Sequence, residues 1–166
     1  MRNIKIVYQY DGSKYYGFQR QKNKDTVQGD IEKIVFSKFN EKINMTSSGR
    51  TDRGVHALGQ VSNFSISKKI PLDAIKQQIN KTLRGRVKIL SIEEIHADFN
   101  ARFDAKRRTY LYVLKNESKI TPFEAPYVTS IKEEIDIDKL QLIFHPFIGM
   151  HDFSSFAKKD EAMRNP

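Results

Sequence analysis

The 166-residue sequence contains no cysteine and no tryptophan. The lack of cysteine excludes disulfide bonds, thiolate zinc sites and a cysteine nucleophile, and it agrees with a reducing cytoplasm, where we expect the protein to act. No run of about 18 apolar residues is present, so we expect no membrane span and no membrane partner. The N-terminal "MRNIKIVYQYDG" alternates like a strand and lacks the long apolar core of a signal peptide.

Acidic residues are in short supply, with 20 Asp and Glu against 29 Lys and Arg, for a formal charge of +9. A basic chain gains free energy by releasing counterions from phosphates, which favours a nucleic-acid partner over a merely solvated basic surface. The four histidines are scattered without ligand spacing, and no GxxxxGK[ST] loop is present, so we expect no metal site. The length suits one domain or slightly more.

The first 97 residues predict a β-α-β-β-α-β order. Period-two alternation indicates strands and apolar residues at helical spacing indicate helices. Asp25 and Gln28 resemble a capping box at the start of the first helix. The order is that of a ferredoxin-like (RRM-like) α+β domain, an antiparallel sheet with both helices on one face and an open opposite face that RNA-recognition modules use. The expected ranges are strand 4–10, helix 25–41, strands 43–49 and 56–66, helix 71–85 and strand 87–95.

Residues 98–166 predict only the start of a second, similar domain. A strand is expected over 107–114, with Tyr110 and Tyr112 on one face, followed by a helix over 136–147 that Asp136 caps and Pro146 ends. The segment 151–156 is expected to begin another strand, after which the chain stops. A half-built sheet leaves apolar surface uncovered, so we expect this chain to be a piece of a longer protein.

The segment "SSGRTDRGVHALGQV" places one carboxylate, Asp52, between Arg50 and Arg53, with Gly49 and Gly54 on either side. Glycines permit a tight bend, and an aspartate in such a bend often bonds only its own backbone. Nearby positive charge favours the ionised carboxylate, which can also act as a nucleophile or a base. The spacing leaves the structural and the catalytic interpretation open.

Two basic segments are candidates for phosphate contact, although either can be a solvated surface. The first runs from Lys14 to Lys24, includes Gln19 and Arg20, and contains aromatic residues. The second runs from Arg102 to Arg108. The residues that we predict to bind RNA are Lys14, Gln19, Arg20, Arg53, His56 and Arg102.

Five segments, in order, resemble the successive motifs of the TruA family of tRNA pseudouridine synthases. They are "YDGSKYYGFQRQKN", "TVQGDIE", "SSGRTDRGVHALGQV", "FNARFDAKRRTYLYVL" and "GMHDFSSFAKKD…NP". The resemblance implies isomerisation of uridine to pseudouridine in the anticodon stem-loop of tRNA, at tRNA positions 38–40. It also implies tRNA as partner, no cofactor, and a homodimer in the full-length protein.

The resemblance assigns roles to three residues. Asp52 matches the essential aspartate, which either attacks the anomeric carbon or takes a proton from the neighbouring ribose carbon. Arg50 matches an arginine that pairs with this aspartate and helps to hold the flipped nucleotide, and Tyr110 matches the tyrosine that stacks on the uracil. Arg53 is a departure, because the family usually has alanine there.

A second departure keeps another function open. The family's basic "FLxxMVR" motif does not occur in this sequence. The alternatives are therefore a noncatalytic RNA-binding module or an inactive fragment of a synthase, and a module of that kind has no use for Asp52. If the synthase interpretation holds, we expect Asp52 and Tyr110 to bracket one flipped nucleotide in a cleft between the two units.

Overall fold

The structure is a computed structural model that describes residues 1–156. It divides into two compact units, Met1–Leu111 and the residues from Tyr112 onward. Residues 98–111, which the sequence analysis assigns to the second domain, therefore lie with the first unit. The last of the five motifs lies partly in residues 157–166, outside the described part of the chain.

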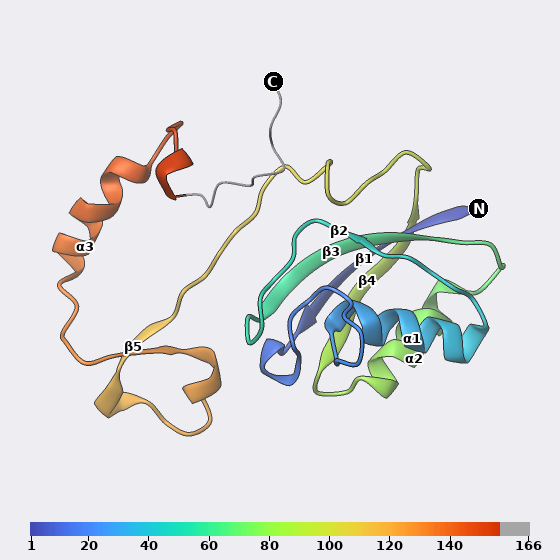
Figure 1. The fold of residues 1–166 in the computed structure, drawn as a ribbon, viewed down its shortest axis with the longest axis horizontal. Helices are drawn as coiled ribbons and strands as arrows, with labels where there is room; N and C mark the ends of the chain where they lie inside the picture. The colour runs from blue at the N-terminus through green and yellow to red at the C-terminus, as the bar shows by residue number, and fades with distance from the viewer. Residues whose placement is uncertain (157–166) are drawn as a thin grey trace. The chain divides into compact units, whose positions relative to one another are not determined.

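The first unit has the expected β-α-β-β-α-β order of elements (Figure 1). Its four strands form one sheet in the order β2-β3-β1-β4, and each neighbouring pair is antiparallel. The helices α1 and α2 contact each other and lie together on one side of this sheet. The elements are β1 (Arg2–Tyr10), the 3-10 turn η1 (Gly12–Lys14), α1 (Val27–Phe39), β2 (Thr46–Ser47), β3 (Ala57–Ile66), α2 (Leu72–Thr82) and β4 (Val87–Ile95).

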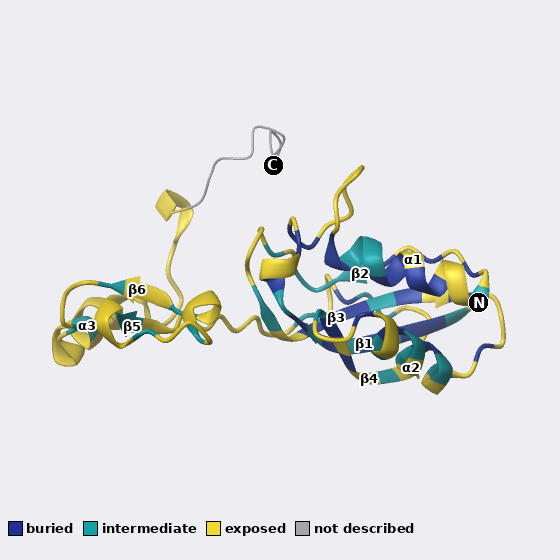
Figure 2. Ribbon diagram, turned by 90° about the horizontal axis from the view of Figure 1, so that it is seen from below, coloured by how far each residue is buried: buried dark blue, intermediate teal, exposed yellow. Residues whose placement is uncertain are grey.

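Alternation along β1 explains which face the helices cover. Ile4, Ile6, Tyr8 and Tyr10 are buried, whereas the intervening residues 5, 7 and 9 are only half-buried. The buried side chains pack with those of β3 and with the apolar stripes of both helices, since residues three and four apart share one helix face. The dark core in Figure 2 follows this interface.

The start of α1 differs from the expected capping box. The cap is Thr26, whose hydroxyl oxygen accepts a hydrogen bond from the Gly29 amide at 3.2 Å. The prediction of Asp25 as cap is wrong by one residue, because a β-branched hydroxyl residue follows it and satisfies the free amide. Gln28 does not cap either, since its side-chain amide donates to Glu32 at 2.8 Å.

The sheet face opposite the helices is partly covered, so the prediction of an open RRM-like face is wrong over this part. The Asn3 side-chain amide donates to the carbonyl oxygens of residues 96, 97 and 99 at 3.0–3.3 Å. Asn63 accepts from the Ala101 amide at 2.9 Å and donates to the Phe99 carbonyl at 3.2 Å. These bonds hold residues 96–101 against β1 and β3, which explains why the following segment groups with the first unit.

The second unit has little regular structure. The strand expected over 107–114 is wrong for most of its length, because ladder bonding begins only at Leu114. The segment 151–156 holds a 3-10 turn where a strand was expected. The elements are β5 (Leu114–Asn116), which pairs in parallel with β6 (Thr129–Ile131), the 3-10 turns η2 (Glu117–Lys119) and η3 (Ala125–Tyr127), α3 (Ile137–Phe144), and the 3-10 turns η4 (His145–Phe147) and η5 (Ser154–Phe156).

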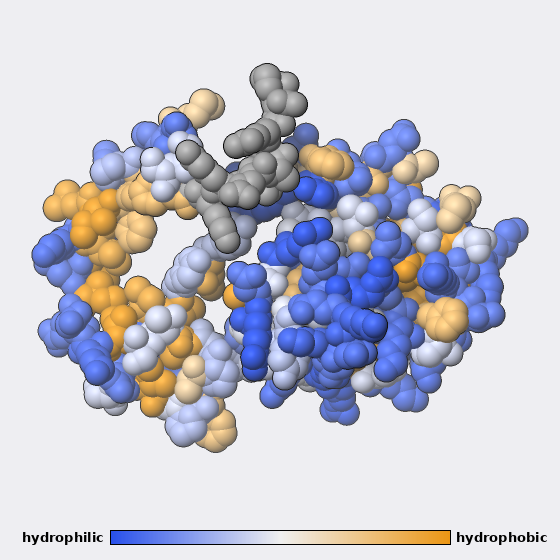
Figure 3. Space-filling model, in the orientation of Figure 1, coloured by the Kyte–Doolittle hydropathy of each residue, from blue (hydrophilic) through white to orange (hydrophobic). Residues whose placement is uncertain are grey.

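The helix α3 begins and ends as expected. Asp136 caps it by accepting from the Lys139 amide at 3.0 Å, and the helix stops at Phe144, two residues before Pro146. None of residues 112–156 is buried, and Figure 3 shows hydrophobic side chains gathered on this unit. Within the described residues, no helix combines the length and apolar character that crossing a bilayer requires.

Candidate functional site

Residues 50–56, named here the Asp52 turn, connect β2 to β3. The Val55 amide donates to the Asp52 carbonyl oxygen at 3.2 Å and closes the bend. Gly54 has a φ of 84°, a left-handed conformation that favours glycine. The Asp52 side chain is exposed at the tip.

Three neighbouring segments support the Asp52 turn. The Tyr10 hydroxyl, at the end of β1, lies 2.8 Å from the Thr51 hydroxyl. The Phe18 amide donates to the Thr51 carbonyl at 3.0 Å. Gly12 lies so close to the turn that a Cβ there would be 2.0 Å from the Val55 carbonyl oxygen. The turn is therefore fixed by β1 and by the loop between β1 and α1.

A buried glutamine fixes the approach to the turn. Gln60 of β3 accepts from the Ser48 hydroxyl at 2.8 Å and donates to the Gly49 carbonyl at 3.1 Å. Arg108 adds a contact from the end of the first unit, because its Nε donates to the Ser48 carbonyl at 2.8 Å. Tyr10 and Gln60 were not predicted as supports of the turn. The signal in the sequence is a polar side chain at a strand position whose alternation points it to the core.

The Asp52 carboxylate has no ion pair or side-chain hydrogen bond to any of residues 1–156. The expected pairing with Arg50 is not formed. The Arg53 guanidinium is instead placed over the Tyr16 ring, 4.6 Å from its centroid. The arrangement leaves an exposed carboxylate that no side chain of residues 1–156 occupies, so it is available to act as a nucleophile or a general base.

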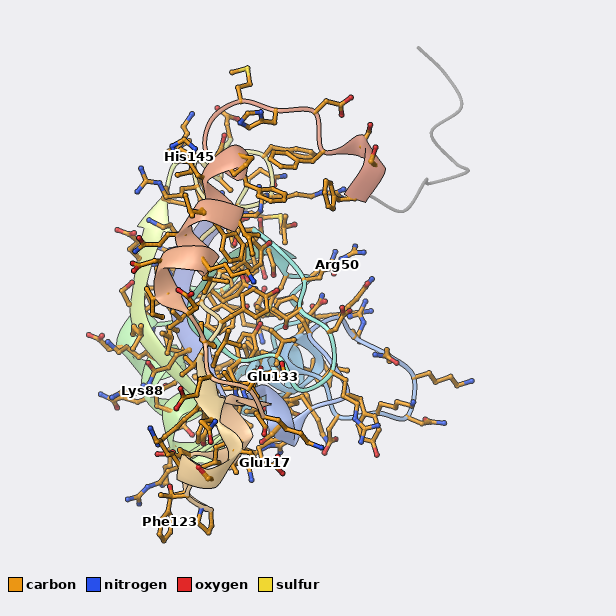
Figure 4. All side chains as sticks on the ribbon, turned by 90° about the vertical axis from the view of Figure 1, so that its left-hand side faces the viewer. Arg50, Lys88, Glu117, Phe123, Glu133 and His145 are labelled. Atoms are coloured by element: carbon orange, nitrogen blue, oxygen red, sulfur yellow. The ribbon has the colours of Figure 1, made fainter. Side chains whose placement is uncertain are left out.

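A hollow of about 290 Å³, named here the arginine hollow, opens beside the turn on the first unit. It brings together three arginines: Arg20 and Arg102, which were predicted to contact RNA, and Arg50, to which the resemblance assigns the flipped nucleotide. Figure 4 shows the labelled Arg50 side chain reaching outward from the first unit. The remaining lining residues are Phe18, Gln19, Gln28, Asn44, Met45, Thr46 and Ser47.

Arg20 has a structural partner that the sequence analysis did not foresee. Its guanidinium lies 2.7 Å from the carboxylate of Glu32, whose side chain is 8% exposed against 58% for Arg20. Glu32 also accepts from the Gln28 side chain at 2.8 Å and the Met45 amide at 3.0 Å. A buried carboxylate thus orients Arg20 at the hollow and offsets its charge.

His56 and Lys14, two further predicted contacts to RNA, lie near η1. The His56 Nδ1 is 3.1 Å from the Gly12 amide and 3.1 Å from the Asp11 carboxylate. One nitrogen accepts from the amide when unprotonated or donates to the carboxylate when protonated. Burial opposes ionisation of Asp11, but hydrogen bonds from Ser13 and the charges of His56 and Lys14 outweigh it, so its pKa is lower than usual.

Tyr110 lies in the first unit, in a segment without regular secondary structure, and its side chain is 74% exposed. The strand that was expected to carry Tyr110 is not formed at this residue. No hydrogen bond or ring contact joins it to Asp52 among the described residues. The same residues contain no group of three or more His, Cys, Asp or Glu that could hold a metal ion.

Comparisons with known proteins agree on one family. Residues 6–104 match the family model described as tRNA pseudouridine synthase. The chain is 41% identical over 160 residues to tRNA pseudouridine synthase A of Caldicellulosiruptor bescii, covering 96% of the chain and 66% of that protein. The corresponding protein of Dictyoglomus thermophilum is 42% identical over 158 residues, which are 94% of the chain and 64% of its own length.

A third relative, tRNA pseudouridine synthase A of Solibacter usitatus, is 40% identical over 160 residues, or 96% of the chain and 67% of that protein. The chain therefore spans about two thirds of the length of the relatives that it matches. The matched family model includes the Asp52 turn and the arginine hollow.

Proposed function

The chain belongs to the tRNA pseudouridine synthase family, and from that membership we propose that it isomerises uridine to pseudouridine in tRNA with Asp52 as the catalytic carboxylate. The observation that carries the proposal is the state of Asp52. Its carboxylate is exposed and unpaired among residues 1–156, while the turn that bears it is held by Tyr10, Phe18 and Gly12.

The reaction breaks the bond from uracil N1 to ribose C1′ and forms a bond from C5 to C1′. The proton on C5 leaves and N1 gains one, so the change is an isomerisation without an oxidant or a hydrolytic water. An ionised Asp52 serves either of two first steps, which are attack at C1′ and removal of the proton at C2′. In both, N1 leaves with the electron pair of the glycosidic bond.

The target base lies in a stack, so the enzyme must extrude it and place side chains around it. In this proposal Arg50 helps to hold the flipped nucleotide and Tyr110 stacks on the uracil. The arginine hollow, with Gln19, Arg20 and Arg102, takes the RNA backbone near the turn. The basic excess supports this assignment, and the exposed position of Tyr110 leaves its ring accessible to a base.

Finer parts of the proposal concern the substrate site and the architecture. We place the target uridines in the anticodon stem-loop, the reaction in the cytoplasm, and the active enzyme in a homodimer. For the first unit we propose the ferredoxin-like fold, which the antiparallel strand order β2-β3-β1-β4 supports. In domain terms we propose residues 1–97 as the domain that carries Asp52 and a second domain from residue 98, whose first residues, 98–111, group with the first unit in this structure.

The test is release of tritium from tRNA labelled at uridine C5. Two proteins are assayed, the 166-residue chain and a chimera in which the matched part of this chain replaces the corresponding segment of the Caldicellulosiruptor bescii relative. Asp52→Asn should abolish release while tRNA binding persists. Asp98→Asn, the same change at an exposed aspartate elsewhere in the first unit, should leave both unchanged.

Release by Asp52→Asn within about tenfold of the parent, or about 1.4 kcal/mol in the barrier, would overturn the assignment. If the parent chimera binds tRNA and releases no tritium, the noncatalytic RNA-binding function is favoured instead.

A further inference from the structure

Two cations share one aromatic side chain next to the Asp52 turn. The Lys24 Nζ lies 4.9 Å and the Arg53 Cζ 4.6 Å from the centroid of the Tyr16 ring. Tyr16 is 46% exposed. The face of an aromatic ring is electron-rich and attracts cations. We name Lys24 and Arg53 the Tyr16 cation pair.

The backbone beneath the ring is fixed. The Tyr16 amide donates to the Asp25 carbonyl at 2.9 Å, and the Gln21 side-chain amide donates to the Tyr16 carbonyl at 2.9 Å. Gly17 follows with a φ of 101° and lies against the backbone of the Asp52 turn. Tyr16 is therefore a fixed anchor, and the cations gathered on it are held beside Asp52.

No carboxylate within residues 1–156 neutralises either cation. Neither Lys24 nor Arg53 forms an ion pair there, whereas Arg20 is paired with Glu32 and Arg86 with Asp30. Asp25, the sequence neighbour of Lys24, lies 3.5 Å from Arg86. Two like charges on one ring repel each other, and an anion that binds between or beside them relieves that repulsion.

We propose that the Tyr16 cation pair binds a phosphate group of the RNA strand that crosses the Asp52 turn. The proposal rests on the proposed function and deepens it. Arg53 offers a planar, two-pronged donor that suits a phosphate, and Lys24 adds a point charge. The stacking also draws Arg53 away from Asp52, so the carboxylate stays free while a cation remains one residue away. Tyr16 is then a positioning residue.

The test measures the affinity of the 166-residue chain for an anticodon stem-loop RNA by fluorescence anisotropy at several salt concentrations. Each phosphate contact contributes about 0.7–0.9 to the slope of log affinity against log salt. Because both cations serve one phosphate, Arg53→Ala, Lys24→Ala and the double variant should each flatten the slope by about that amount. When the salt concentration is raised from about 50 to 200 mM, the affinity of the parent should fall by a factor about three times larger than the affinity of any of these variants.

Matched controls remove the same charges elsewhere. Arg84→Ala and Lys33→Ala change exposed cations that form no ion pair or side-chain hydrogen bond among residues 1–156, and they should keep the parent slope. Tyr16→Phe keeps the aromatic face and should bind like the parent, whereas Tyr16→Leu removes it and should weaken binding several-fold. Comparing the Tyr16→Phe and Tyr16→Leu variants separates anchoring of the cations by the ring from hydrogen bonding by its hydroxyl group.

Equal slopes for Arg53→Ala and Arg84→Ala would overturn this inference and leave the proposed function standing, provided that Asp52→Asn still loses tritium release. If RNA binding by the parent shows no dependence on salt, this inference fails, and the tritium assay alone decides the proposed function. If Tyr16→Leu binds as tightly as the parent, Tyr16 does not position the pair.

Discussion

Replacing Arg20 by alanine leaves the Glu32 carboxylate buried without its cation. Glu32 retains its bonds from Gln28 and the Met45 amide, so desolvation is only partly offset. Removing one partner of a fully buried pair costs about 3–5 kcal/mol. Because Arg20 is 58% exposed, water screens part of this interaction, and we expect a loss of about 2 kcal/mol for Arg20→Ala.

Glu32→Ala should cost more, about 3–4 kcal/mol. It opens a cavity, leaves the Met45 amide without an acceptor, and leaves the Gln28 side-chain amide with only the Met45 carbonyl at 3.4 Å. A double variant, Arg20→Ala with Glu32→Ala, removes the two charges together. It should lie closer to the parent than the sum of the single losses, with a coupling of about 1–2 kcal/mol.

The assay is urea unfolding followed by far-UV circular dichroism, because the chain has no tryptophan to report by fluorescence. Arg84→Ala, at an exposed arginine, is the control and should stay within about 0.5 kcal/mol of the parent. A loss of less than about 0.5 kcal/mol for Arg20→Ala would refute the reasoning, because Glu32 would then be satisfied without it. Weak RNA binding by an Arg20 variant must therefore be corrected for stability before it is read as a lost phosphate contact.

Tyr10→Phe removes the hydroxyl that is bonded to Thr51 of the Asp52 turn. It should lower kcat in the chimera, change RNA affinity little and reduce the free energy of unfolding by about 1 kcal/mol. A kcat equal to that of the parent would contradict the supporting role of Tyr10. Gly12→Ala places a methyl group 2.0 Å from a backbone oxygen and should cost about 3 kcal/mol in urea unfolding, whereas Gly59→Ala, with open space around it, should cost far less. The pKa of Asp11 is lowered in the folded state, so its stabilisation is present above the ordinary pKa of about 4 and is lost as pH falls through the folded value. The stability gap between parent and Asp11→Asn should therefore be open at pH 7 and close in acid, and a gap of constant size would exclude this cause.

Local patterns in the sequence determined most of the first unit. The alternation of β1 and β4 and the apolar spacing of α1 and α2 follow from which residues avoid water, and each needs only a few neighbouring positions to be recognised. The motif around Asp52 likewise predicted a glycine-bearing bend and the family. These features depend on short-range chemistry that the sequence displays directly.

The tertiary structure decided what each polar side chain does. Asn3 and Asn63 hold residues 96–101 over part of the sheet face that was expected to be open. Glu32 forms an ion pair with Arg20. The prediction of a strand over 107–114 was wrong because a strand forms only where another segment supplies hydrogen bonds. Alternation along the sequence does not show whether such a partner is present.

Arg53 shows most clearly what the sequence determines and what the tertiary structure determines. The sequence placed it next to Asp52 and predicted positive charge at the carboxylate. The fold instead brings the ring of Tyr16, from the loop between β1 and α1, under the Arg53 guanidinium. The Asp52 carboxylate remains unpaired among residues 1–156. Sequence fixes which charges are neighbours along the chain, but their energies depend on distances through space, and only the packing of distant segments sets those distances.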